Sequence, residues 1–180
     1  MGRISRWSLR NRRRFWSRLL LSYSRSWRGY VWRLPLGDTE NTLNGQCHCG
    51  IVQFEVKLSE GFETIRRCNC SFCRMRGAIA VSAEVSGMKI LQGADALTRY
   101  RFNTMTAEHF FCSRCGIYTH HQRRSDPNLY GVNVACLDGV SPFDFFEVPV
   151  TDGIHHPKDT GGKARSAGTL RFFPADRNAE

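Results

Sequence analysis

Three cysteines lie close together in the segment RCNCSFCRMRG, at positions Cys68, Cys70 and Cys73. A Cys-x-Cys-x-x-Cys run can place three sulfur atoms on one face of a zinc ion, whereas a fourth sulfur from so short a loop would strain the backbone. An open fourth position is typical of a catalytic zinc, and a closed tetrahedron is typical of a structural one. The loop therefore predicts a working zinc site, with the alternative that a distant cysteine or histidine closes it.

Four further cysteines form two close pairs, Cys47-x-Cys49 and Cys112-x-x-Cys115. The second pair lies in FCSRCGI, the form of a zinc knuckle, in which glycine permits the tight turn and backbone amides face the sulfurs. Together the pairs predict a four-sulfur structural site, although spacing alone leaves an exchange of pairs between the two sites open. Close-set pairs have poor disulfide geometry, and no secretory signal is evident, so disulfides are disfavoured. Cys136 stands alone.

The start of the chain differs in composition from the rest. Residues 1–34 hold ten arginines and no acid, so the remaining 16 Lys and Arg balance all 16 Asp and Glu. All four tryptophans also lie there. The composition matches a transit peptide, but the longest apolar run, residues 19–21, is far too short for a signal peptide or a membrane span. We expect a disordered extension or a short amphipathic helix that contacts anionic lipid or nucleic acid, or else translated sequence upstream of the true start.

After this extension the chain reads as a series of strands. Val52, Phe54, Val56 and Leu58 alternate with polar residues at period two, which predicts a half-buried strand. Later short runs are rich in β-branched or aromatic residues, and Gly, Asn, Asp and Pro separate them. We predict a mainly β fold with antiparallel sheets and room for a single turn of helix. The expected parts are an extension (1–40), a zinc-binding domain (41–160) and a C-terminal tail or late edge strand (161–180).

The order of four segments, GQCHCGIVQFEV, CNCSFCRMRGA, HFFCSRCGIYTH and GVNVACLDG, resembles the family of glutathione-dependent formaldehyde-activating enzymes and centromere protein V. The resemblance covers about residues 43–157. It implies an Mss4-like antiparallel β-sheet fold with two zinc ions per chain, a structural zinc on Cys47, Cys49, Cys112 and Cys115, and a catalytic zinc on the three-cysteine loop. Cys136 departs from the pattern, which has a small residue more often at this place.

The chemistry of the three-cysteine loop agrees with this family. Zinc on three thiolates carries a net charge of about −1, so it is a weak Lewis acid that acidifies bound water less than zinc on neutral histidines does. Such a site would instead hold an incoming thiol deprotonated for attack on a small carbonyl. The resemblance implies addition of glutathione to formaldehyde, the S-(hydroxymethyl)glutathione synthase reaction of a carbon-sulfur lyase, or action on another small thiol in the cytoplasm.

One alternative comes from a different class, a non-catalytic zinc scaffold that contacts protein or nucleic acid through the arginine-rich extension. A zinc deaminase is disfavoured because the sequence lacks both His-x-Glu and Pro-Cys-x-x-Cys. A methionine sulfoxide reductase, with Cys136 as its reactive cysteine, would need two zinc Cys-x-x-Cys pairs, and only Cys112 and Cys115 form such a pair followed by glycine. The sequence leaves the physiological thiol, the carbonyl substrate and the oligomeric state undetermined.

Arginines and histidines near the cysteine motifs are candidates for supporting roles. Arg66, Arg67, Arg74 and Arg76 flank the three-cysteine loop and could attract the carboxylates of glutathione, and we assign that binding to Arg74 and Arg76. His48 and His109 lie inside the cysteine motifs, where a packing or ligand-supporting role is expected. For acid–base chemistry the candidate is one histidine of the DGIHHP segment, His155 or His156.

Overall fold

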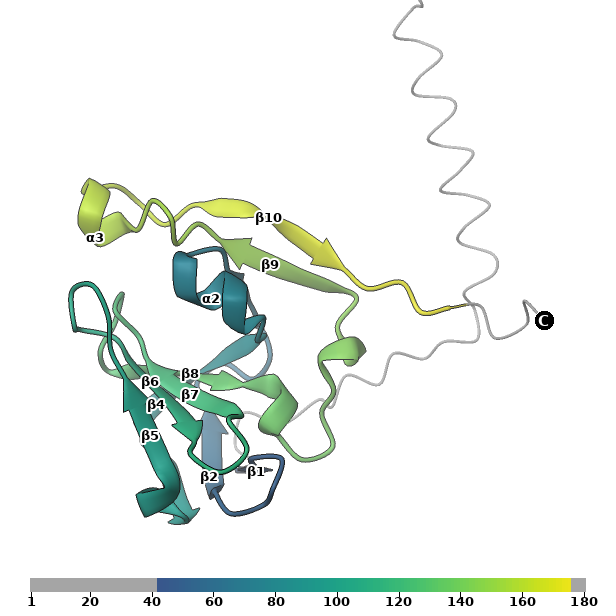
Figure 1. Cartoon of the computed structure of the whole chain (residues 1–180). Helices are drawn as coiled ribbons and strands as arrows, with labels where there is room; N and C mark the ends of the chain where they lie inside the picture. The colour runs from purple at the N-terminus through teal and green to yellow at the C-terminus, as the bar shows by residue number, and fades with distance from the viewer. Residues whose placement is uncertain (1–41, 176–180) are drawn as a thin grey trace, which may run out of the picture. The chain divides into compact units, whose positions relative to one another are not determined.

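The computed structural model describes residues 42–175 (Figure 1), so predictions that concern residues 1–40 lie outside the described part of the chain. The described chain contains ten strands: β1 (Leu43–Gln46), β2 (Gln53–Leu58), β3 (Arg67–Cys68), β4 (Ala80–Gln92), β5 (Leu97–Tyr100), β6 (Glu108–Cys112), β7 (Tyr118–Gln122), β8 (Leu129–Asn133), β9 (Glu147–Thr151) and β10 (Ser166–Arg171). Its helices are α2 (Ser71–Arg76), α3 (Pro157–Thr160) and three 3-10 turns, η1 (Ala94–Ala96), η2 (Val134–Cys136) and η3 (Pro142–Asp144).

The strands form two sheets. The larger has seven strands in the order β1-β2-β4-β8-β7-β6-β5, and every pair in it is antiparallel. The smaller has the order β10-β9-β3, in which only the short β3 pairs in parallel with its neighbour. The prediction of a mainly β fold with antiparallel sheets is confirmed. Strand β10 lies within the segment that we expected to be a tail or a late edge strand.

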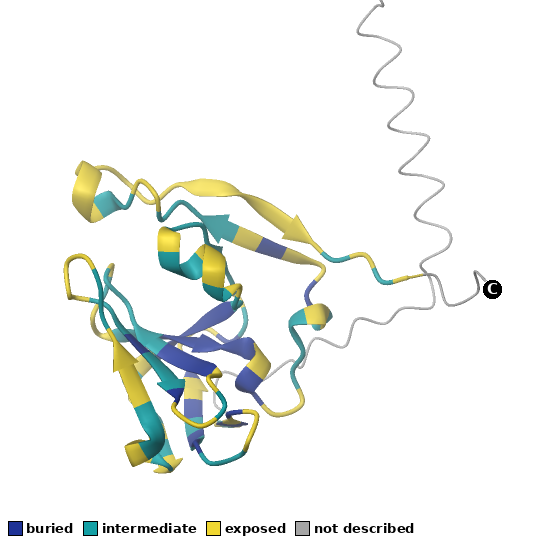
Figure 2. Ribbon diagram, in the orientation of Figure 1, coloured by how far each residue is buried: buried dark blue, intermediate teal, exposed yellow. Residues whose placement is uncertain are grey.

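Burial follows the alternation seen in the sequence. Phe54, Val56 and Leu58 of β2 point into the core, while the residues between them are partly or fully exposed. They pack with buried residues of the neighbouring strands, among them Val81 and Val132. Each such side chain contributes about 1.5–3 kcal/mol when removed from water. Figure 2 shows this buried layer along the large sheet, whereas β10 is exposed throughout.

Helix α2 is the element that the sequence pattern did not place. Cys70 precedes it, and its sulfur accepts a hydrogen bond from the Cys73 amide, as an N-cap side chain does. Gly77 ends it with φ of 71°, a left-handed conformation that favours glycine. A helix of six residues is too short to show a period of 3.6, so only its caps could have revealed it.

The segment between Arg66 and Ala80 is a closed loop. The two residues exchange backbone hydrogen bonds of 2.9 Å in each direction, so the chain leaves and returns at the same point. β3, the three cysteines and α2 all lie between these ends. In Figure 1, α2 lies between the β9–β10 hairpin and the large sheet. The loop therefore presents its cysteines where the two sheets face one another.

No helix within residues 42–175 has the length and hydropathy that a membrane span requires.

A buried histidine gives the fold a predictable response to acid. His120 is 3% exposed, stacks on Phe110 at 4.5 Å between ring centroids, and contacts Tyr130 edge-on at 4.9 Å. Burial lowers the pKa of His120 to about 4. An unfolded chain would bind a proton there near pH 6.5, so this contribution to stability is complete above that pH and is lost as the pH falls towards 4.

We predict that His120→Phe flattens the dependence of unfolding free energy on pH by about 3 kcal/mol between pH 6.5 and 4, because it removes the buried titrating group. Urea unfolding at a series of pH values measures the effect. Phe110→Leu is the matched control: it weakens the stacking on the ring at every pH but leaves the slope unchanged. Parallel curves for the wild type and His120→Phe would contradict the prediction.

Candidate metal centres and substrate pocket

The first sulfur cluster joins the two edges of the large sheet. Cys47 and Cys49 follow edge strand β1, whereas Cys112 ends β6, next to the opposite edge, and Cys115 lies in the turn after it. All four sulfurs lie within 4.8 Å of one another, with separations of 3.5 Å from Cys47 to Cys49 and 3.7 Å from Cys49 to Cys112. A tetrahedron with Zn–S bonds of 2.3 Å has S–S edges of about 3.8 Å. The cluster therefore fits a four-coordinate zinc ion.

The backbone around this cluster has the geometry of a zinc knuckle. The Val52 amide donates to Cys47 Sγ at 3.4 Å, and the Gly116 amide donates to the Cys112 carbonyl at 2.8 Å. Gly116 has φ of +70°, while a Cβ there would meet no atom within 4 Å. The turn thus needs glycine for its backbone conformation and not for space. Buried Val52 packs against Cys47 and Cys112 in a second, smaller core beneath the sulfurs.

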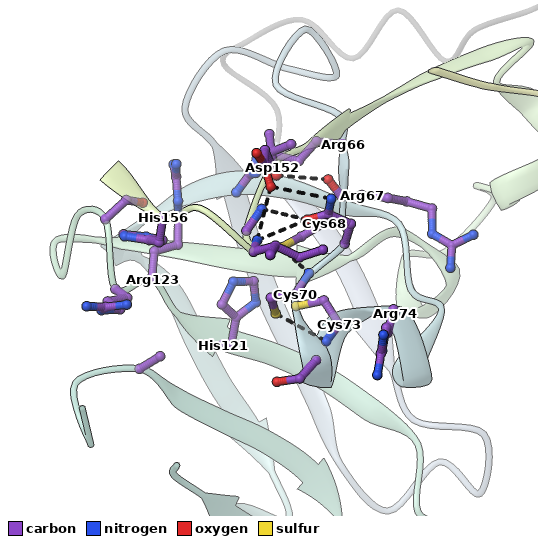
Figure 3. A pocket seen from close by; sticks show the side chains of 18 of the residues that line it. Arg66, Arg67, Cys68, Cys70, Cys73, Arg74, His121, Arg123, Asp152 and His156 are labelled. Carbon is purple, nitrogen blue, oxygen red and sulfur yellow. Dashed lines mark hydrogen bonds between the residues drawn. The ribbon is translucent and has the colours of Figure 1, made fainter. Parts of the chain in front are cut away.

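The second sulfur cluster comes from the closed loop alone. Cys68 ends β3, Cys70 caps α2 and Cys73 lies within that helix, and their sulfurs are within 4.8 Å of one another. The Cys70 amide donates to Cys68 Sγ, and the Cys73 amide donates to Cys70 Sγ, each at 3.4 Å. No fourth cysteine, histidine or carboxylate of residues 42–175 joins the group. Figure 3 shows the three side chains together beside His121.

The charge of the second cluster favours a cation between its sulfurs. Hydrogen bonds among the three cysteines lower the pKa of Cys70 and raise the pKa of Cys68 and Cys73, so one thiolate is shared within the cluster. Arg76 Nη2 donates to Cys73 Sγ at 3.5 Å, which brings a positive charge to a second sulfur. A group of three adjacent sulfurs with such help fits zinc, whose ligand is the thiolate.

A loop from the small sheet fixes the position of the three cysteines. The side-chain oxygen of Asn69 accepts hydrogen bonds from the amides of Gly153 at 2.7 Å and Ile154 at 3.2 Å. A Cβ added at Gly153 would overlap Cys68 Sγ and lie 2.9 Å from Cys70 Cβ. The backbone at residue 153 therefore packs directly on the sulfurs, and only glycine leaves room for them.

A pocket of about 550 Å³ opens beside the three sulfurs, within the range of ligand sites. Its lining includes seven arginines: Arg66, Arg67, Arg74, Arg76, Arg123, Arg124 and Arg165. Only two acids line it, and both are engaged: Asp152 contacts His155 at 2.9 Å, and Asp159 accepts from Arg124 at 2.7 Å. The excess of positive charge favours an anionic ligand.

The two arginines assigned to glutathione differ in their surroundings. Both line the pocket, and Arg74 is exposed. The guanidinium of Arg76 instead lies over the Tyr118 ring, 3.6 Å from its centroid, and donates to His109 Nδ1 at 3.2 Å. Arg76 thus already contacts Tyr118 and His109, in addition to its hydrogen bond to Cys73. Substrate binding by either arginine stays a prediction.

Among the histidines of the sequence analysis, His156 lines the pocket, whereas His155 contacts Asp152 and lies outside the pocket lining. His48 is exposed beside the first sulfur cluster. His109 is 4% exposed and packs at 4.4 Å from the ring of Phe72 in α2. A packing or ligand-supporting role for His109 is consistent with these contacts.

Sequence reasoning did not foresee that His109, His121 and Tyr118 form one group. His109 and His121 are directly paired across β6 and β7, with ring centroids 5.3 Å apart, and the Tyr118 hydroxyl contacts His121 Nδ1 and donates to the Gly131 carbonyl at 2.9 Å. Burial and the nearby Arg76 lower the pKa of both histidines, that of His109 to about 4. The pairing register of two adjacent strands would have revealed this group. Period-two alternation in HFFC and YTHH suggests two strands but does not fix their register.

We predict that the two sulfur clusters respond differently to the loss of one cysteine. Cys112→Ala should unfold the domain, because it removes a ligand that joins distant strands, whereas Cys70→Ala should leave a folded chain that lacks one zinc. Circular dichroism and zinc analysis measure both outcomes. Equal loss of structure in the two variants would contradict the division of roles.

We also predict that Gly153→Ala weakens metal binding at the three-cysteine cluster by at least about tenfold, because the added methyl group displaces Cys68. Competition with a chelating dye measures this, and the zinc of the four-cysteine cluster should remain. Gly162→Ala serves as the control, since a Cβ there approaches only the Thr160 hydroxyl, at 3.4 Å. Unchanged zinc affinity in Gly153→Ala would contradict the prediction, because the loop around residue 153 would then have shifted to accommodate the methyl group.

Comparisons with known proteins agree with this site. The sequence model of the family described as glutathione-dependent formaldehyde-activating enzyme matches residues 42–146. A protein of Halomonas elongata, itself provisionally named as such an enzyme, is 34% identical over 82 residues, which are 41% of this chain and 51% of that protein. The chain thus spans about half the length of this relative.

A crystal structure of a Rhodobacter sphaeroides protein shares 60% sequence identity and a TM-score of 0.59, covering 60% of this chain and 99% of that one. The family match covers more than half of the chain and includes all seven cysteines of the two sulfur clusters. This chain belongs to the glutathione-dependent formaldehyde-activating enzyme family.

Proposed function

We propose that this protein is a zinc-dependent carbon-sulfur lyase of the S-(hydroxymethyl)glutathione synthase type, which adds the thiol of glutathione, or of a related small thiol, to formaldehyde. Membership of the family supports formaldehyde activation. The observation that carries the proposal is the three-sulfur cluster, which has no fourth ligand among residues 42–175 and opens into the arginine-rich pocket. A non-catalytic scaffold would need no such pocket beside an open set of ligands.

Two zinc ions per chain form part of the proposal, one in each sulfur cluster. When bound by Cys68, Cys70 and Cys73, zinc would supply an open fourth position where a thiol binds as the thiolate. Arg76 offsets the negative charge of the cluster through Cys73 and stacks on Tyr118, so its position is fixed from two sides. The Arg76 guanidinium can therefore stabilise negative charge at the sulfurs while its contact with the Tyr118 ring shields it from solvent.

The remaining chemistry concerns the carbonyl oxygen of formaldehyde. As the C–S bond forms, the C=O π pair moves to oxygen, which then takes up a proton. Because a guanidinium only donates, Arg76 obliges His109 Nδ1 to accept, and the neutral ring carries its proton on Nε2. That Nε2 is buried without a hydrogen-bond partner in the described chain, and His109 lines the pocket. It is therefore our candidate hydrogen-bond donor to the developing alkoxide, which takes its proton from solvent in exchange for the proton that the thiol releases on binding.

We also propose that the protein works in the cytoplasm. All eight cysteines are free, and at least seven of them must stay reduced for both clusters to bind metal. A compartment rich in reduced glutathione meets that need and supplies the substrate.

We predict that glutathione changes the visible absorption spectrum of the cobalt-substituted protein, because a fourth sulfur ligand enters an open site. Cys73→Ser should abolish the response. Zinc-loaded protein should also speed glutathione–formaldehyde exchange above the rate with an equal amount of metal-free protein, measured as initial rates by exchange NMR.

Cys136→Ala is the control, since Cys136 is buried against Asn133 and the Tyr118 carbonyl, outside both sulfur clusters. It should keep both the spectrum and the rate. A spectral response without any acceleration would point to a different carbonyl or thiol adduct, and the absence of any response would contradict thiol binding.

A further inference from the structure

Two arginines of the pocket converge on one buried hydroxyl. Arg66 Nη1 donates to Ser82 Oγ at 2.9 Å, and Arg123 Nη1 donates to the same oxygen at 3.2 Å. Ser82 is 2% exposed on β4 and lies outside the pocket lining, whereas both arginines belong to it. Two guanidinium groups are thus held side by side by a neutral group that compensates neither charge.

Neither guanidinium has a carboxylate partner within ion-pair distance anywhere in residues 42–175. Arg66 Nη2 is also buried without a hydrogen-bond partner. Holding two cations together in this way costs free energy, which a bound anion would recover.

Two other arginines of the pocket lack this property. Arg124 is paired with Asp159, and Arg76 is held by Cys73, His109 and the Tyr118 ring. Arg66 and Arg123 are therefore partly buried pocket arginines that share one buried hydroxyl and have no carboxylate at ion-pair distance, while Asp126 acts on Arg123 only from farther away. Their planar donor groups suit a carboxylate, which can accept two parallel hydrogen bonds from a guanidinium.

We propose that Arg66 and Arg123, joined through Ser82, form a carboxylate-binding subsite that selects acidic thiols over neutral ones. The proposal rests on the thiol-binding function above, and it names the part of the pocket that recognises the carboxylate of the substrate. Arg66 lies two residues before Cys68, and both line the same pocket. A ligand such as glutathione, with a carboxylate several bonds from its sulfur, could reach the arginine pair and the open sulfur cluster at once.

The test uses S-methylglutathione, which keeps both carboxylates but has no free thiol, and its diethyl ester, which has neither free carboxylate. Calorimetry on the zinc-loaded full-length protein should show tighter binding of the acid than of the ester. Arg123→Gln should weaken binding of the acid on the order of tenfold, the loss expected for a charge-assisted hydrogen bond, and leave ester binding unchanged.

Two further variants guard against indirect effects. Arg123→Lys keeps the charge but not the planar donor group, so it should fall between the wild type and Arg123→Gln. Arg99→Gln removes an exposed arginine that pairs with Glu108 outside the pocket lining, and it should bind as the wild type does. Arg123→Lys also provides a folded comparison if Arg123→Gln loses its circular dichroism signal.

Equal affinity of the wild type for acid and ester, or equal affinity of the wild type and Arg123→Gln for the acid, would overturn the subsite. The cobalt spectrum with 2-mercaptoethanol, a neutral thiol, tests the thiol-binding function separately. Arg123→Gln should keep that response, because the open sulfur cluster is intact. If the subsite test fails while 2-mercaptoethanol still changes the cobalt spectrum, the proposed thiol-binding function stands. If the subsite test succeeds but 2-mercaptoethanol gives no response, the pocket binds carboxylates and the thiol-binding function is contradicted.

Discussion

The constraint on which the rest of the structure depends is the meeting of four sulfurs from opposite edges of one sheet. Cys47 and Cys49 follow β1, whereas Cys112 and Cys115 flank the turn after β6. Four thiolates at such separations repel one another unless a cation lies between them, so a zinc ion there would both cancel the repulsion and close the sheet. The strands β6 and β7, which carry His109 and His121 to the pocket, are thereby held in register with the core.

A second constraint acts on the three-cysteine loop, which must be rigid without being closed by a fourth ligand. The backbone pair between Arg66 and Ala80 fixes its ends, the capping interaction of Cys70 fixes the helix, and Asn69 fixes the loop that carries Gly153. None of these contacts brings a fourth cysteine, histidine or carboxylate to the three sulfurs. A metal site supported in this way can exchange its fourth ligand while its three sulfurs stay in place.

Spacing identified seven cysteines as metal ligands and alternation placed β2, because both signals are local in sequence. The division of the cysteines into groups of four and three also needed the family resemblance. The helix α2 was missed because its six residues carry cap signals but no periodicity. His109, His121 and Arg123 reach the pocket only through pairing between strands, which a single sequence does not specify. Arg76 was recognised as a pocket residue, but its contact with Tyr118 depends on a residue 42 positions away.

The distribution of charge separates two tasks that share the pocket. Beyond residue 34 the chain is formally neutral, with 16 basic and 16 acidic residues, so the positive potential of the pocket is local and does not come from the net charge. Arg76 faces the sulfurs, where binding of a thiolate would add negative charge to a cluster that already carries about −1. Arg66 and Arg123 instead donate hydrogen bonds to Ser82, and neither donates one to a sulfur of the cluster. With this division, one pair of arginines can bind the carboxylate of a substrate while Arg76 continues to stabilise the negative charge of the sulfurs. Tighter substrate binding therefore need not reduce the nucleophilicity of the bound thiolate.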